Sequence, residues 1–116
     1  MQVKEGFFIM VKHPKYQAMD DARQEAIPRL FAEICGNRQD LSLERVEPVV
    51  AVDPKPGPIP RPIFHVKQAG RDDNLAVIHP NGYAECFDDS FKDSFEKMVQ
   101  ELEDIAKQAL RDFNGH

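Results

Sequence analysis

Cysteine is scarce in this chain, and no apolar run is long. Cys35 and Cys86 lie far apart, with no CxxC or Cys/His spacing around them. A disulfide framework is therefore disfavoured, and free, buried thiols are expected. The apolar run Phe7–Val11 ends at Lys12 and is too short for a signal segment or a membrane span. We therefore expect a cytoplasmic protein.

Motifs for catalysis and for phosphate binding are also absent. The six glycines are scattered, and none lies between a strand and a helix as a phosphate-binding loop requires. The histidines have no ligand spacing for a metal, and Cys86 is expected among alanines, where a thiol is inert. The sequence therefore predicts no cofactor, no metal site and no catalytic residue.

Charge is distributed unevenly along the chain. The net charge is −5; residues 1–84 hold eleven acids and eleven bases, whereas residues 85–116 hold nine acids and four bases. A field of this sign repels phosphate backbones and attracts basic surfaces. We expect no direct nucleic-acid binding and favour a protein partner with a basic surface. The alternative is a solvated helix face that only keeps the protein soluble.

Prolines at every second position distinguish residues 53–62, which read Asp-Pro-Lys-Pro-Gly-Pro-Ile-Pro-Arg-Pro. Each proline fixes its own φ and keeps the residue before it out of the helical region, so the segment is expected to be an extended, semi-rigid spacer. The three-residue step of a PxxP ligand is absent. The spacer either only connects two parts of the domain or also contacts a partner through Pro56, Pro58, Ile59 and Arg61.

Helical periodicity appears twice. Apolar residues recur at helical spacing from about Asp20 to Ile34, and Pro28 is expected to kink or break that helix. The clearer pattern runs from Phe91 to Phe113, alternating steps of four and three. Ser90 with Asp93 resembles a capping box at its start, and Asn114-Gly115 follows its end.

Strand patterns occupy most of the remaining chain. They are expected at residues 3–11, which stop at His13-Pro14, at 46–52, and at Ile63–Gln68, Leu75–His79 and Tyr83–Phe87. The order is β-α-β-spacer-β-β-β-α. We predict a single α+β domain, residues 1–116, with one mostly antiparallel sheet of about five strands and two helices packed on it.

The turn at Pro80-Asn81-Gly82 sets the last hairpin and should pair His79 with Tyr83. If Gln68 also lies opposite Leu75, alternation gathers large apolar and polar side chains on one face of the sheet: Phe64, Val66, Leu75, Val77, His79, Tyr83, Glu85 and Phe87. That face is either core, covered by the first helix or the first strand, or an interface.

The favoured hypothesis is a small acidic module that binds a protein and masks its surface, as an adaptor, inhibitor, immunity-type or regulatory factor. The expected binding residues are those of the spacer and five on the sheet face, Phe64, His79, Tyr83, Glu85 and Phe87. A homodimer is a further possibility. The competing hypothesis is a small enzyme or ligand-binding domain that uses His79, Tyr83 and Glu85 in an aromatic pocket.

Overall fold

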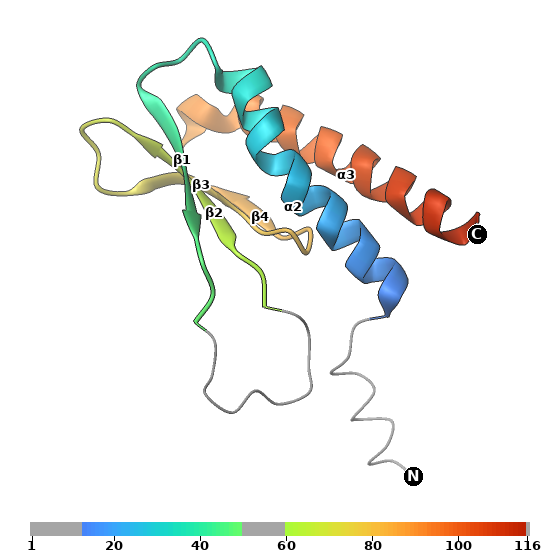
Figure 1. Ribbon diagram of the computed structural model, residues 1–116. Helices are drawn as coiled ribbons and strands as arrows, with labels where there is room; N and C mark the ends of the chain where they lie inside the picture. The colour runs from blue at the N-terminus through green and yellow to red at the C-terminus, as the bar shows by residue number, and fades with distance from the viewer. Residues whose placement is uncertain (1–12, 50–59, 116) are drawn as a thin grey trace.

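Two long helices and one antiparallel sheet make up the part of the chain that the computed structural model describes, residues 13–49 and 60–115 (Figure 1). The elements are α2 (Pro14–Cys35), β1 (Leu41–Val46), β2 (Ile63–Gln68), β3 (Asn74–Ile78), β4 (Ala84–Cys86), the 3-10 turn η1 (Asp89–Phe91) and α3 (Lys92–Asn114). The α+β class is confirmed. The described sheet has four strands instead of about five, and the strand expected at residues 3–11 lies outside the described residues.

The four described strands form a meander in the order β1-β2-β3-β4, so β1 and β4 are the edges of the described sheet. Figure 1 shows α2 and α3 side by side on the same face of this sheet. The apolar core lies between the two layers and is formed by side chains including Ile27, Leu30, Phe64, Val66, Leu75, Ile78, Met98 and Leu102. No described helix covers the other face, which we call the outer face of the sheet.

Helix α2 begins at Pro14, about six residues before the expected start. Proline suits the first helical position because its fixed φ is helical and no donor is needed there. The His13 side chain caps the helix, since its Nδ1 accepts a hydrogen bond from the Lys15 backbone N–H at 3.1 Å. His13-Pro14 therefore starts a helix.

The helix also continues through Pro28, so of the kink or break expected there, the break is wrong. Pro28 is exposed and cannot donate to the carbonyl of Gln24 four residues earlier. Ile27 and Leu30 on either side of it are fully buried. Burial of this apolar face holds the helix together across the missing hydrogen bond.

Strand β1 was expected at residues 46–52 but occupies Leu41–Val46. Leu41 and Leu43 face the helices and lie opposite Gln68 and Val66 of β2. Glu47, Pro48 and Val49 follow the strand without belonging to it, and residues 50–52 lie outside the described residues. The alternation of Leu41 and Leu43, which builds the core, was the signal for this strand.

The register between β2 and β3 differs by one residue from the predicted one. Phe64 lies opposite Ile78 and Val66 opposite Ala76, and the pairing shifts by one residue between Val66 and Lys67. A one-residue slip moves every side chain of a strand to the other face. Phe64 and Val66 therefore face the helices, with 1% and 0% of their surface exposed, and the predicted placement of Phe64 beside Tyr83 is wrong.

The Ser90–Asp93 capping box predicted for α3 is not formed, since no side chain caps the first residue of that helix. Asp88 instead caps η1, the turn that leads into α3: its Oδ1 accepts hydrogen bonds from the Ser90 N–H at 2.8 Å and from the Ser90 hydroxyl at 2.6 Å. Arg71 also forms an ion pair with Asp88. These hydrogen bonds and the Arg71 charge lower the pKa of Asp88 to about 2. At the other end, Gly115 donates to the Arg111 carbonyl at 2.9 Å, as the Asn114-Gly115 stop predicts.

Asp88→Asn should reduce stability at neutral pH and leave it unchanged in strong acid. A carboxyl whose pKa is depressed by folding stabilises the protein above its ordinary value of 3.8, and that contribution disappears as the pH falls through about 2. The difference in Tm between wild type and variant should therefore be constant above pH 5 and shrink steadily towards pH 2. Melting curves across that range test it, and a difference that does not change with pH contradicts it.

Candidate protein-binding surface

The β3–β4 turn positions the residues on the outer face of β4. The His79 N–H donates to the Tyr83 carbonyl at 2.8 Å, and the Gly82 N–H donates to the His79 carbonyl at 3.2 Å. Gly82 has φ +100°, a conformation that side chains rarely adopt. The predicted pairing of His79 with Tyr83 is confirmed. Alternation along β4 then sends Tyr83, Glu85 and Phe87 to the outer face.

His79, Tyr83, Glu85 and Phe87 form a group that we call the β4 aromatic cluster. The Tyr83 hydroxyl donates to Glu85 Oε1 at 2.6 Å, and the His79 and Tyr83 rings meet edge to face with centroids 5.1 Å apart. Tyr83 is 53% exposed and Phe87 56% exposed. His79, Tyr83 and Glu85 are thus held by contacts with one another, while the rings of Tyr83 and Phe87 remain open to solvent.

The charge of this cluster at pH 7 is the carboxylate of Glu85. Burial and, to a lesser extent, the charge of His65 lower the pKa of His79, so its ring is neutral at pH 7. The hydrogen bond to Glu85 and the Glu85 charge raise the pKa of Tyr83, so the phenol keeps its proton. The Glu85 carboxylate is therefore hydrogen-bonded to an uncharged tyrosine, whose ring in turn contacts an uncharged histidine.

Further across the sheet, the charges compensate one another. Glu44 of β1 lies 3.6 Å from His65 Nδ1 and 3.7 Å from Lys67 Nζ, both on β2. The β1–β2 side of the outer face is consequently a charged, paired surface, which stays in water at little cost.

The structure separates the other predicted binding residues from the cluster. Phe64 is in the core. The Arg61 side chain is only 13% exposed; its guanidinium contacts Asp21 at 2.7 Å and donates to Gln24 Oε1 at 2.9 Å, both on α2. Pro56, Pro58 and Ile59 lie outside the described residues, as does most of the predicted spacer.

A buried ion network on the other side of the sheet escaped the sequence-based prediction. Arg23 lies 3.2 Å from Asp20 and 3.3 Å from Glu103 of α3, and it donates to the Pro80 carbonyl at 3.3 Å. Asp20 also lies 3.8 Å from Arg61. The network ties α2 to the β3–β4 turn, to α3 and to the chain entering β2. The available signal was spacing, since Asp20 and Arg23 line up with Ile27 and Leu30 on the buried face of α2.

The cysteines are free within the described residues. Cys35 is 2% exposed, and burial raises the pKa of its thiol, so that thiol is expected to react slowly. Cys86 is half-buried and its Sγ lies 3.3 Å from the Asp88 carbonyl. It lines a pocket between β4 and the first turns of α3, together with Asp89, Lys92, Phe95 and Glu96.

A second pocket bears on the ligand-binding hypothesis. His79 contributes to a small pocket that runs towards the buried Arg23, but its lining contains neither Tyr83 nor Glu85; it is lined by Arg23, Ile78, His79, Gly82, Ala84, Val99, Leu102 and Glu103. His79, Tyr83 and Glu85 therefore do not line one common cavity.

Comparisons with known proteins provide no relatives. The chain matches no family model, no curated protein and no solved structure. Neither described helix is long and apolar enough to cross a membrane. Among residues 13–49 and 60–115, no three or more His, Cys, Asp or Glu side chains gather as metal ligands would. The function has to be inferred from the surface itself.

Proposed function

We propose that the protein binds another protein through the β4 aromatic cluster and masks part of that partner's surface. The observation that carries this proposal is the exposure of Tyr83 and Phe87, 53% and 56%, on a sheet face that no described helix covers. Exposed aromatic rings beside a polar group are typical of protein interfaces, where tyrosine and phenylalanine are enriched.

The internal contacts of the cluster favour binding. Tyr83 is held by its hydrogen bond to Glu85 and by the His79 ring, so little side-chain entropy is lost when a partner packs against it. A rigid aromatic ring with a satisfied hydroxyl is the kind of side chain that dominates binding energy at interfaces.

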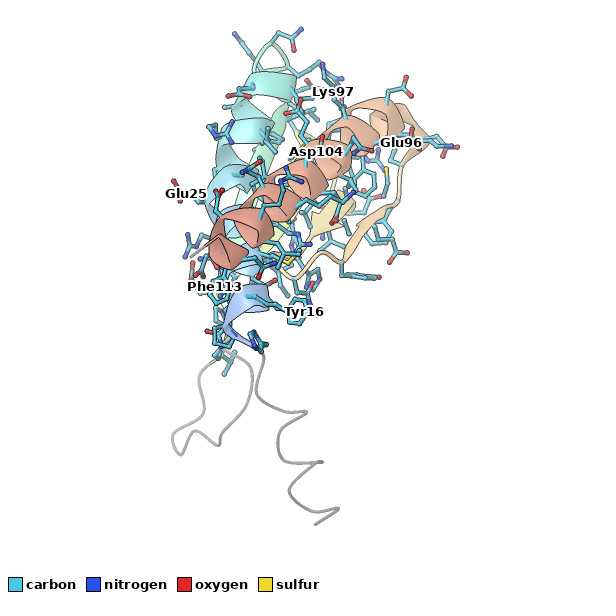
Figure 2. All side chains as sticks on the ribbon, turned by 90° about the vertical axis from the view of Figure 1, so that its right-hand side faces the viewer. Tyr16, Glu25, Glu96, Lys97, Asp104 and Phe113 are labelled. Carbon is cyan, nitrogen blue, oxygen red and sulfur yellow. The ribbon has the colours of Figure 1, made fainter. Side chains whose placement is uncertain are left out.

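The acidic C-terminal part of the chain favours a partner with a basic surface. Residues 85–116 hold nine acids against four bases. Figure 2 shows Glu96 and Asp104 along α3 with side chains directed outwards. Complementary charge raises the rate of encounter more than the final affinity, so a partner with a basic surface would associate rapidly at low salt. The protein would then act as an adaptor, an inhibitor, an immunity-type protein or a regulator.

The competing proposal, a small enzyme or ligand site at His79, Tyr83 and Glu85, has less support. A binding pocket encloses most of its ligand. Tyr83 and Glu85 lie on an open face, and the pocket at His79 extends away from them. An exposed surface of this shape suits a partner protein better than a small molecule.

Phe87→Ala should weaken binding to the partner at least tenfold, because truncation of an aromatic side chain that is a hot spot of an interface costs about 2 kcal/mol or more. The partner is first identified by retention on immobilised protein from an extract of the producing organism, then purified and titrated by calorimetry. Phe113→Ala is the matched control, since Phe113 is 39% exposed at the far end of α3 (Figure 2).

The control variant should bind within twofold of wild type, and both variants should melt within a few degrees of it. Equal affinities for Phe87→Ala and wild type would reject the cluster as the binding surface.

A further inference from the structure

We propose that the edge of β4, with which no further described strand pairs, binds an extended polypeptide segment by strand addition, and that this segment alternates basic and apolar residues. This inference rests on the proposed function and specifies the partner chemistry. Three features of the described residues carry it: the direction of the β4 backbone groups, a pocket on the helix side of the strand, and a carboxylate between two rings on the outer side.

The backbone of β4 has donors and acceptors that the sheet does not use. Tyr83 accepts a hydrogen bond from His79, and Phe87 donates to Leu75 at 2.8 Å, so Tyr83, Glu85 and Phe87 direct their main-chain groups towards β3. In an antiparallel ladder the intervening residues point the other way. The N–H and C=O groups of Ala84 and Cys86 therefore face outwards along the edge, where an added strand can pair with them.

Side chains of an added strand would alternate between two different surfaces. On the outer side they meet Tyr83, Glu85 and Phe87. On the helix side they meet the pocket next to Cys86, whose apolar lining is Cys86 and Phe95. One face of the bound segment is thus expected to fill an apolar pocket, and the other is expected to cross the aromatic rings.

The charges select a cation for the outer side. Glu85 offers a carboxylate there, and the flanking rings attract a cation through their faces. On the helix side, Asp89 and Glu96 outnumber Lys92 around the pocket, and the neighbouring Asp88 is already paired with Arg71. A lysine or arginine on the outer side and an apolar residue in the pocket satisfy both surfaces.

The other edge strand is less suited to this role. On β1, Glu44, Arg45 and the following Glu47 are exposed, and Arg45 and Glu47 form an ion pair. Charged side chains on an edge are a common protection against strand addition. The β4 edge is therefore the better docking strand.

The probe for this proposal is a labelled peptide of four Lys-Val repeats, compared with four Glu-Val repeats. The basic peptide should bind at least tenfold more tightly, and the preference should fall as salt is added. Binding should slow amide hydrogen exchange at Ala84 and Cys86 at least tenfold. It should also slow alkylation of Cys86 by iodoacetamide to a similar extent, because a valine would fill the pocket beside that thiol.

Ala84→Pro is the decisive variant, because it removes an outward N–H that β3 does not use. It should weaken binding of the basic peptide at least tenfold. The protein with Arg45→Pro, on the β1 edge, should bind that peptide with the affinity of wild type. Melting curves establish whether each variant is folded. The exchange and alkylation measurements use the wild-type protein, so they test the proposal even if a variant does not fold.

Several results would overturn strand addition: equal affinity for the two peptides, unchanged exchange at Ala84 and Cys86, or full binding by folded Ala84→Pro. Even with these results, the wider proposed function would stand if Phe87→Ala still weakened binding to the purified partner. Loss of that effect as well would reject both.

Discussion

Asp20→Ala should lower the free energy of unfolding by about 3–5 kcal/mol, because it removes the buried carboxylate shared by two guanidinium groups and leaves them with only their more exposed acidic partners. The Asp20 side chain is 4% exposed and lies between two guanidinium groups, those of Arg23 at 3.2 Å and Arg61 at 3.8 Å. Without the carboxylate, two largely buried cations are left near each other. Urea unfolding followed by circular dichroism measures the loss.

Asp21→Ala is the control that separates burial from charge. Asp21 also pairs with Arg61, at 2.7 Å, but its side chain is 69% exposed. Exposed ion pairs contribute about 1 kcal/mol at most, so this variant should unfold within about 1 kcal/mol of wild type. If the two variants lost similar free energies of unfolding, the buried network would contribute no more to stability than a surface ion pair.

Local patterns predicted the parts of the fold that depend on neighbouring residues. The apolar steps of four and three placed α3, and β2 was placed at its observed bounds. The Pro80-Asn81-Gly82 turn was predicted because proline and glycine restrict a few adjacent dihedral angles in a known way. In each case the determining interactions lie within one helix or one hairpin.

The register between β2 and β3 depends on more distant features, and there the prediction failed. The sequence-based register has Gln68 opposite Leu75, whereas in the structure Val66 lies opposite Ala76 and the pairing shifts by one residue between Val66 and Lys67. Leu75 has no partner residue in β2 at this irregularity, and it is buried next to Ala76. Alternation alone cannot reveal such a shift, because both registers keep the period of two.

The partners in the buried ion network could not be predicted from the sequence for a related reason. Arg23 is partnered by Pro80 and Glu103, which are 57 and 80 residues away in the sequence. A charged residue on an apolar helix face is a signal that a partner exists, but its identity follows only from the packing of α2 against α3 and the hairpin. Sequence reasoning thus named all four residues of the β4 aromatic cluster, wrongly added Phe64, and missed the buried polar contacts.

Phe64→Ala should be as damaging as the loss of Asp20, at about 3–5 kcal/mol, through a different mechanism. Phe64 is 1% exposed and belongs to the core between the sheet and the helices, so truncation removes apolar contacts and leaves a cavity. Phe87→Ala makes the same chemical change at a side chain that is 56% exposed and should cost less than about 1 kcal/mol.

The pair of variants tests the register directly. In the register predicted from the sequence, Phe64 and Phe87 share a face and their truncations should have similar effects on stability. In the observed register, Phe64→Ala should lower the urea midpoint sharply, and Phe87→Ala should leave it almost unchanged while weakening partner binding. Comparable losses of stability for both would contradict the observed register, because only a shared environment gives the same substitution the same cost at the two positions.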